Sequence, residues 1–325
     1  MGAIISGIGV YYPENTLTNA DLERLVETTD EWIVTRTGIR ERHILPKESP
    51  LKASDLGAKA ALEALEKAGL KPEDVGAIIV NAIVPDKQFP AVACLIQEKI
   101  GAKNAFAFDI TAACSGFVYG VNLASLMIDS GQCEHVLVIG AELLSRAVDW
   151  TDRNTCILFG DAGGAAVLSR APQDETGSNR GVLRSLLRSD GSYSDILYLD
   201  PLLNNEAGTG ACIRMDGKQV FKVAVTEVTR VVNDALALEG LTPADLDLFV
   251  AHQANVRILG AIGEKLGLSE DKVVINVQRF GNTSSASVPL ALYEAEQAGR
   301  LKPGMLVALA AVGGGMAWGC NIVRW

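Results

Sequence analysis

Short apolar runs alternate with longer mixed runs along this chain. Residues 77–80 (AIIV) and 248–251 (LFVA) are continuously apolar, which is typical of strands buried on both faces of a sheet. Each follows a helix-like segment that ends at a glycine, Gly69 or Gly240, with a proline three residues later. This alternation predicts an α/β protein built from layers of helices and sheets.

The same order of elements occurs twice in the sequence. The segments GLKPEDV and GLTPADL begin at Gly69 and Gly240, which correspond with an offset of 240 − 69 = 171. Two further pairs repeat in the same order, EKIG at 98–101 with EKLG at 264–267, and residues 131–141 with residues 299–311. We therefore expect an ancient duplication, with similar α/β halves at residues 1–171 and 172–325 that pack together.

The repeat also places three chemically useful side chains at loop tips. The stretch that ends at Cys114 matches the turn at residues 281–285, which contains Asn282. The strand that ends at Asn81 matches the one that ends just before His252. Because α/β proteins build their sites at strand ends, we expect these loop tips to face one pseudo-twofold axis.

Cys114 lies between a predicted strand and a predicted helix, so its thiol is expected at a helix N-terminus. Unpaired backbone N–H groups and the helix dipole favour a thiolate there, which predicts a lowered pKa and a nucleophile near neutral pH. A cysteine suits acyl transfer between thioesters, because the leaving group is also a thiol. The alternative interpretation is a small buried cysteine that serves only packing.

His252 and Asn282 extend this chemistry. An imidazole that donates from Nε2, beside an asparagine amide, can stabilise a thioester enolate without carrying charge. Backbone N–H groups of Cys114 and of the glycine turn at residues 313–315 can hold the oxyanion of an acyl-enzyme. Taken singly, these residues could be a structural histidine, a turn-forming asparagine and a packing device. Their joint position at loop tips favours an active site.

Composition narrows the function classes. The chain has 325 residues, of which 48% are hydrophobic, and a net charge of −10, which opposes general affinity for nucleic acids. Six cysteines without a C-x-x-C pair and three scattered histidines predict reduced thiols and no metal site. No apolar run reaches the roughly 18 residues that span a bilayer and no signal peptide is evident, so we expect a cytoplasmic protein without membrane partners.

Five motifs together resemble β-ketoacyl-acyl-carrier-protein synthase III, a family of the thiolase superfamily. They are TRTGIRER at 35–42, AACSG at 112–116, HQAN at 252–255, GNTSSAS at 281–287 and GGGMAWG at 313–319. The match runs in order from the first predicted strand to the last residues of the chain. The resemblance implies a thiolase-like, duplicated αβαβα layered fold, a homodimer, and the initiating condensation of type II fatty-acid synthesis.

The resemblance implies a role for each catalytic candidate. Cys114 takes an acyl group from acyl-CoA, and malonyl-acyl-carrier protein then loses CO₂ while His252 and Asn282 stabilise the enolate. The enolate attacks the acyl-enzyme and gives 3-oxoacyl-acyl-carrier protein. The implied oxyanion hole consists of the N–H groups of Cys114 and Gly314. No cofactor is expected beyond the CoA thioester, which is a substrate.

Substrate-binding residues are implied in the same way. Trp32 and Arg153 are expected to sandwich the adenine of CoA. Arg36 is expected to meet the CoA phosphates, and Asn255 to position the pantetheine or malonyl end. Trp32 follows two acidic residues in a polar stretch, which fits an exposed aromatic ring that stacks on a purine.

Contacts with protein partners are implied as well. Phe89 is expected to cross the dimer interface and close the acyl pocket of the second subunit, which favours short primers. Arg257, with Lys222 and Lys265, is expected to dock the acidic carrier protein. Glu264 stands where some relatives carry a second basic residue, which predicts a weaker electrostatic attraction.

Three alternatives stay open from the sequence. A thiolase-superfamily synthase that joins other acyl groups has the same residue set, a Cys-His-Asn hydrolase would release free acid, and a silent scaffold would bind CoA without chemistry. Asn282 in place of a second histidine argues against an elongating synthase, and Cys320 beyond the glycine triplet argues against a thiolase. The length and branching of the primer stay undetermined.

Overall fold

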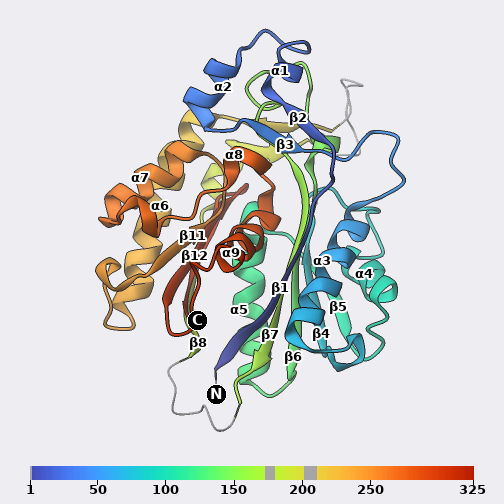
Figure 1. Ribbon diagram of the computed structural model, residues 1–325, viewed down its shortest axis with the longest axis vertical. Coiled ribbons are helices and arrows are strands. Elements are labelled where there is room, and N and C mark those ends of the chain that lie inside the picture. The colour runs from blue at the N-terminus through green and yellow to red at the C-terminus, as the bar shows by residue number, and fades with distance from the viewer. Residues whose placement is uncertain (1, 173–179, 201–210) are drawn as a thin grey trace.

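A computed structural model describes residues 2–172, 180–200 and 211–325, and two sheets form its centre (Figure 1). In spatial order, the first sheet contains β1 (Ala3–Tyr11), β7 (Asp161–Arg170), β6 (His135–Leu143), β4 (Ala77–Asn81) and β5 (Phe106–Ile110). The second contains β11 (Leu248–Ala251), β12 (Leu306–Gly313), β13 (Ala317–Arg324) and β8 (Gly181–Ser189). Two small pairs are β2 (Thr16–Thr18) with β3 (Glu41–His43), and β9 (Leu197–Leu199) with β10 (Ile213–Met215).

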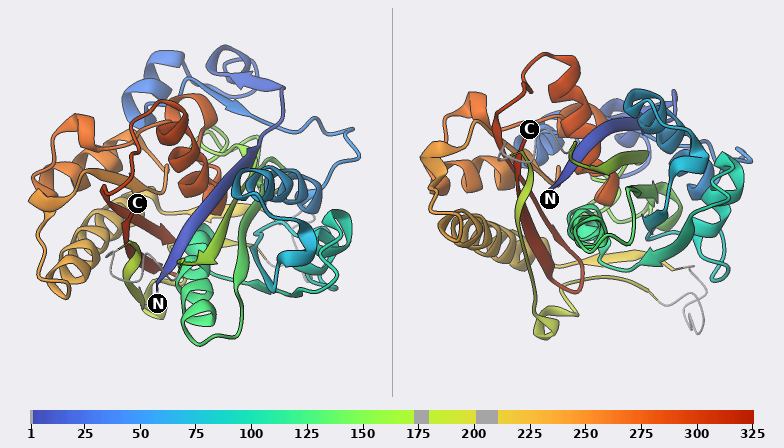
Figure 2. Two further views of the ribbon diagram at one scale, coloured as in Figure 1. Left: turned by 60° about the horizontal axis from the view of Figure 1, so that its bottom comes forward. Right: turned by 90° about the horizontal axis from the view of Figure 1, so that it is seen from below.

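Helices cover both sheets and fill the space between them. The described helices are α1 (Asn19–Leu22), α2 (Asp30–Thr37), α3 (Ala53–Ala68), α4 (Val92–Ile100), α5 (Gly116–Asp129), α6 (Gly217–Ala237), α7 (Val256–Leu266), α8 (Val277–Phe280) and α9 (Ser287–Gln297). Helices α3 and α4 pack on the outer face of the first sheet, and α6 and α7 on the outer face of the second (Figures 1 and 2). Helices α5 and α9 lie between the sheets, which completes five αβαβα layers.

Burial on both faces explains the continuous apolar runs. Along β12, Ala308 and Ala310 belong to the core beneath α6 and α7, whereas Val307 and Leu309 belong to the core around α5 and α9. Since successive side chains of a strand point to opposite faces, every position of such a strand must be apolar. Apolar and polar residues therefore do not alternate along β12, as they would in a strand with one face exposed to solvent.

The duplication is visible in three dimensions. Strands β4 and β11 begin at an offset of 248 − 77 = 171, and β6 and β12 at the same offset, 306 − 135 = 171. The strand order is also the same when the second sheet is taken from its other end, because β8, β13, β12 and β11 follow one another as β1, β7, β6 and β4 do. Where the first sheet has β5, the second half has an isolated parallel bridge between Phe249 and Val273. The predicted division between residues 171 and 172 falls between β7 and β8, and its exact place stays a prediction.

Residues 16–43 form a cap at one end of the molecule. Helices α1 and α2 and the β2–β3 pair lie there, next to α7 and α8 (Figure 1). The side-chain amide of Asn255, at the start of α7, donates to the backbone oxygen of Arg36 at 3.0 Å and joins this cap to the second half. No helix in the described part of the chain is long and apolar enough to cross a bilayer.

Candidate active site

A cavity of about 1460 Å³ is lined by residues of both halves and collects most of the predicted site residues. Cys114, His252, Asn282 and Gly314 all line it. Its volume exceeds the roughly 300–1,000 Å³ of pockets for drug-sized ligands, so it suits a long substrate. Within the described ranges, no group of three His, Cys, Asp or Glu side chains could hold a metal ion.

Cys114 lies in a 3-10 turn (Ala113–Ser115) that leads directly into α5, at the helix N-terminus that the sequence predicted. The residue is only 6% exposed, and burial raises the pKa of its thiol to about 12. Ser284 lowers this pKa by hydrogen bonding, and the negative charge of Glu142 raises it. The expected lowering of the pKa is therefore wrong, because the cost of burying a charged sulfur outweighs the helix dipole.

We expect alkylation of Cys114 by iodoacetamide to accelerate about tenfold per pH unit between about pH 7 and 10, because only the thiolate reacts and its pKa lies above that range. Mass mapping of peptides after timed quenching measures the rate at this residue and separates it from the partly exposed Cys94. A rate that levels off below about pH 8 contradicts the prediction and shows that the helix dipole controls the thiol.

His252 follows β11 and is 6% exposed. Burial lowers its pKa to about 4, so the imidazole is neutral near pH 7. Its Nδ1 lies 2.6 Å from the hydroxyl of Ser287, a partner that the sequence did not reveal. That hydroxyl also lies 2.7 Å from the backbone oxygen of Ser284, so its hydrogen can point to either acceptor. When it points to Nδ1, the proton of His252 is on Nε2, as enolate stabilisation requires.

Backbone hydrogen bonds hold Asn282 in place. Its N–H donates to the carbonyl of Leu158 at 2.8 Å, and it forms an isolated parallel bridge with Phe159. The Oδ1 atom of Asn282 accepts from the N–H of Ser284 at 2.8 Å, which fixes the orientation of the amide. Among the residues that the structure describes, the NH₂ group of Asn282 has no hydrogen-bond partner, so it can donate to a substrate.

The glycine turn approaches the nucleophile from the end of β12. A Cβ atom at Gly313 would lie 2.7 Å from the backbone nitrogen of Cys114, so only glycine permits this contact. Ala113, Ser284 and Met316 have φ angles of 45°, 49° and 41°, and within the described ranges they are the non-glycine residues with positive φ. Each belongs to one of the three loops around the site, where backbone strain commonly accompanies function.

A buried polar cluster beside Cys114 escaped the sequence analysis. It consists of Asn81, Glu142 and Ser285, which are hydrogen-bonded to one another and almost fully buried. The offset of the repeat relates Asn81 to His252 (252 − 81 = 171) and Cys114 to Ser285 (285 − 114 = 171), so it could have found two of the three. Glu142 ends an apolar run that contains no sign of a site.

The structure brings Trp32 and Arg153 together. Trp32 and Arg36 belong to α2 and line the cavity, where Trp32 is partly exposed and Arg36 is exposed. The guanidinium of Arg153 lies 5.0 Å from the centroid of the Trp32 ring, and that of Arg36 lies 4.3 Å from it. A purine does not fit between Trp32 and either guanidinium at these separations, so the predicted sandwich would require an arginine to move.

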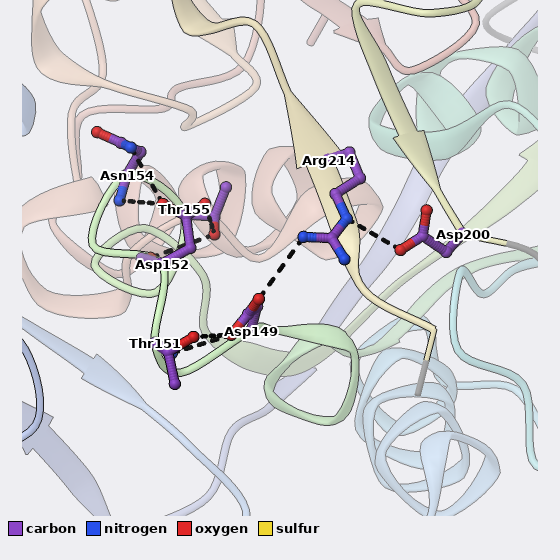
Figure 3. Close-up of polar contacts among 7 residues, drawn as sticks. All are labelled: Asp149, Thr151, Asp152, Asn154, Thr155, Asp200 and Arg214. Atoms are coloured by element: carbon purple, nitrogen blue, oxygen red, sulfur yellow. Dashed lines mark hydrogen bonds and ion pairs between the residues drawn. The ribbon is translucent and has the colours of Figure 1, made fainter. Parts of the chain in front are cut away.

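Side-chain hydrogen bonds and an ion pair hold the loop that carries Arg153 (Figure 3). Asp149 accepts hydrogen bonds from the N–H and the hydroxyl of Thr151, at 3.0 and 2.7 Å. Arg214 of β10 lies 3.6 Å from Asp149 and 2.9 Å from Asp200, which connects the loop to the β9–β10 pair. Because ion pairs this exposed are weak, they hold the loop without locking it.

Asn255 has a structural use as well as a place in the cavity. It is the N-cap of α7, where its Oδ1 accepts from the N–H of Arg257 at 2.7 Å. Both residues line the cavity. The side chain of Asn255 therefore links the backbones of α2 and α7, and the residue also borders the cavity.

The remaining predicted residues are spread out. Arg257 lies 5.9 Å from the ring of Phe221 on α6, the helix that also carries the exposed Lys222. Lys265 is in the last turn of α7, about 12 Å along the helix from Arg257, so the predicted basic set does not form one tight patch. Phe89 is 84% exposed and does not line the described cavity of its own chain.

Comparison with known proteins identifies the family. The family described as "3-Oxoacyl-[acyl-carrier-protein (ACP)] synthase III" matches residues 108–191, and the corresponding C-terminal family matches residues 236–325. A beta-ketoacyl-[acyl-carrier-protein] synthase III from Chelativorans sp. (strain BNC1) is 49% identical over 321 residues, which cover 99% of this chain and 98% of the relative.

Solved structures agree with this match. The crystal structure of 3-oxoacyl-[acyl-carrier-protein] synthase III from Aquifex aeolicus VF5 has a TM-score of 0.93 and 45% identity, and covers 100% of both chains. The priming β-ketosynthase from the R1128 polyketide biosynthetic pathway has a TM-score of 0.91 and 33% identity, over 99% of this chain and 95% of the other. These likenesses confirm the predicted thiolase-like fold. The chain thus belongs to the β-ketoacyl-acyl-carrier-protein synthase III family of condensing acyltransferases.

Proposed function

We propose that this condensing enzyme performs the initiating step of type II fatty-acid synthesis, in which acyl-CoA and malonyl-acyl-carrier protein give 3-oxoacyl-acyl-carrier protein, CoA and CO₂. One observation carries the proposal. The thiol of Cys114, the neutral imidazole of His252 and the unpaired NH₂ group of Asn282 line the same cavity. A nucleophile beside two uncharged donors is the set that a decarboxylative condensation requires.

In the first half reaction, the sulfur of Cys114 attacks the thioester carbonyl of acyl-CoA. A C–S bond forms to Cys114, the C–S bond to CoA breaks, and the thiol proton ends on the sulfur of CoA. The N–H groups of Cys114 and Gly314 are the proposed oxyanion hole.

In the second half reaction, the malonyl group loses CO₂ and its thioester becomes an enolate. The NH₂ group of Asn282 and the Nε2–H group of His252 donate to the enolate oxygen. The enolate carbon attacks the acyl-enzyme, so a C–C bond forms and the C–S bond to Cys114 breaks. The released thiolate takes a proton from water. Because His252 is uncharged near pH 7, it stabilises the enolate without quenching it.

Incubation of the protein with acetyl-CoA and malonyl-acyl-carrier protein tests the proposal. We expect one CoA and one CO₂ for each 3-oxoacyl-carrier formed, measured by mass spectrometry of the carrier and by trapping of the gas. Free acetate without any need for a malonyl substrate would indicate a hydrolase instead. Binding of CoA without turnover would indicate a scaffold, and condensation only with another extender would indicate a synthase of other products.

Trp32 is proposed to stack on the adenine of CoA with Arg153, while Arg36 meets the phosphates and Asn255 positions the pantetheine. We expect Trp32→Ala to raise the KM for acetyl-CoA about tenfold with little change in kcat, because stacking of an aromatic ring on a base contributes about 1–3 kcal/mol. Steady-state kinetics measure both constants.

Acetyl-pantetheine is the matched control for this variant, because it reacts at the same carbonyl but has no adenine. Its KM should be the same for the Trp32→Ala variant and the unaltered enzyme. An equal rise in KM with both donors contradicts the stacking role and indicates damage to α2, which also carries Arg36.

The protein partners are proposals of the same kind. The acidic carrier protein is proposed to dock beside Arg257 and Lys222, with Lys265 as an outlying contact. A homodimer is proposed along the edge strand β5, which ends the first sheet and presents Phe106, 42% exposed. The exposed Phe89 is then free to reach the acyl pocket of the second subunit. A cytoplasmic location and the lack of nucleic-acid, membrane, metal and cofactor partners stay predictions.

A further inference from the structure

The buried cluster of Asn81, Glu142 and Ser285 occupies the position related to the catalytic set by the internal repeat. Asn81 corresponds to His252, and Ser285 corresponds to Cys114, each at the offset of the repeat (252 − 81 = 171 and 285 − 114 = 171). Cys114 and Ser285 lie in two 3-10 turns, Ala113–Ser115 and Ser284–Ala286. These turns are related by the same offset (284 − 113 = 171) and pack against each other. The cluster therefore lies where the two catalytic loops meet.

Glu142 connects both loops through one carboxyl oxygen, Oε1. Oε1 accepts from the hydroxyl of Ser285 and, at 3.3 Å, from its N–H, and Ser285 lies three residues beyond Asn282. Oε1 also accepts from the NH₂ group of Asn81 at 3.1 Å, and the Oδ1 of Asn81 accepts from the N–H of Ala112 at 3.1 Å, two residues before the nucleophile. One carboxyl group thus links the loop of the nucleophile to the loop of Asn282.

Within the described ranges, only hydrogen bonds compensate the burial of Glu142. The residue is 0% exposed and has no ion-pair partner among the described residues, and burial raises the pKa of its carboxyl to about 7. A fourth donor, the N–H of Ile83, binds Oε2 at 3.1 Å. Because a well-packed apolar side chain would avoid this desolvation cost, the burial of a carboxyl here points to a role in the geometry of its partners.

The surrounding backbone fixes the cluster tightly. A Cβ atom at Gly140 of β6 would lie 2.5 Å from the carbonyl carbon of Ser285. A Cβ atom at Gly116, the first residue of α5, would lie 2.2 Å from the side-chain carbon Cγ of Asn81. Strand, helix and both loops are therefore in contact through glycines, so a shift of the cluster is passed directly to the catalytic loops.

We propose that Glu142 is a positioning residue that holds the loop of Cys114 in register with the loop of Asn282, so that condensation depends on it and acylation does not. The inference rests on the proposed function. Acylation needs only the Cys114 loop and its oxyanion hole. Condensation needs the acyl-enzyme and the enolate donors at a fixed separation, and a displacement of about 1 Å can cost about 100-fold in rate.

The test compares the two half reactions in Glu142→Gln. The glutamine NH₂ group would face another donor, either Ile83 N–H or the Asn81 amide, so the link between the loops is weakened at nearly constant volume. Intact mass gives the fraction of chains that acetyl-CoA can acylate and the rate at which they do so. Rapid mixing of the acyl-enzyme with malonyl-acyl-carrier protein then gives the rate of condensation per acylated chain.

We expect condensation per acylated chain to slow at least about tenfold in Glu142→Gln, whereas acylation should slow by no more than about threefold, because loss of the Glu142 charge lowers the pKa of Cys114. Glu63→Gln is the matched control. Glu63 also joins separate elements, by accepting from the N–H of Val10 and the hydroxyl of Tyr293, but it does not line the cavity. Both of its half reactions should stay within about threefold.

A purely structural role would lower the fraction of chains that can be acylated and leave both rates per competent chain unchanged, which overturns the inference. So does an equal loss in both half reactions. If Glu142→Gln does not fold, Ser285→Ala removes the hydroxyl that binds Glu142 and Asn81 but keeps the bond from the Ser285 N–H to Glu142, so it should show the same selective loss at smaller size. Failure of the unaltered enzyme in either half reaction overturns the proposed function itself, and this inference with it.

Discussion

The Cys114→Ser variant is expected to form no acyl adduct with acetyl-CoA and to lose synthase activity by at least about 10³-fold. A serine hydroxyl is a much weaker nucleophile than a thiol unless a strong base activates it. The candidate base, His252, has its pKa lowered to about 4 by burial, so it cannot activate an alcohol effectively. Intact-protein mass after incubation with the donor measures the adduct directly.

The same experiment ranks primers when acetyl-, propionyl-, isobutyryl- and octanoyl-CoA are run side by side. Cys94→Ser is the matched control, because Cys94 is a partly buried thiol on α4 outside the cavity, and its loss should leave the adduct unchanged. An adduct that persists in Cys114→Ser and maps to a peptide without position 114 places acylation on another residue. If no CoA donor acylates the unaltered protein, the CoA-primed assignment is wrong and carrier-bound donors or a scaffold must be considered.

The Asn282→Ala variant is expected to keep acylation within about threefold and to lose about 10²- to 10³-fold in condensation. The reason is that its NH₂ group donates only to the enolate, and removal of one such donor typically has this effect. Single-turnover consumption of the acyl-enzyme by malonyl-acyl-carrier protein measures the loss. Acyl-enzyme should accumulate in the variant, since the step that forms it does not use Asn282.

A structural role for Asn282 makes a different prediction. Its Oδ1 also holds the N–H of Ser284 at 2.8 Å, so a collapse of this loop would impair both half reactions to the same extent. That outcome would contradict the assignment of the NH₂ group to the enolate. Asn104→Ala, in which an exposed amide loses its bond to the carbonyl of Glu73, is a control that should leave both half reactions unchanged.

The layered fold could be predicted because its signals are local and occur twice. Apolar runs such as 77–80 and 248–251 reflect burial on both faces, and the offset between Gly69 and Gly240 determines how the halves correspond. The sequence did not predict that the second half lacks a strand equivalent to β5. The apolar run near Val273 looks like a strand, but in the structure it pairs with β11 only through one isolated bridge.

The candidate site was predicted in part for the same reason. The repeat places Cys114, His252 and Asn282 at loop tips, but it contains no information on how deeply the loops are buried. Burial comes from distant segments, and it reverses the expected shift of the thiol pKa. Glu142 was missed because its partners Asn81 and Ser285 are 61 and 143 residues away in sequence.

The cavity also determines the order of events. Because Trp32 and Cys114 line the same space, the arms of the two proposed substrates must use it in turn, and free CoA has to leave before the carrier-bound malonyl group can react. The enzyme then alternates between a free-thiol form and a thioester form, as in double-displacement kinetics. In the proposed reaction, the ratio of acyl-CoA to CoA would set how much enzyme is in the thioester form, so chain initiation would follow the supply of acyl groups.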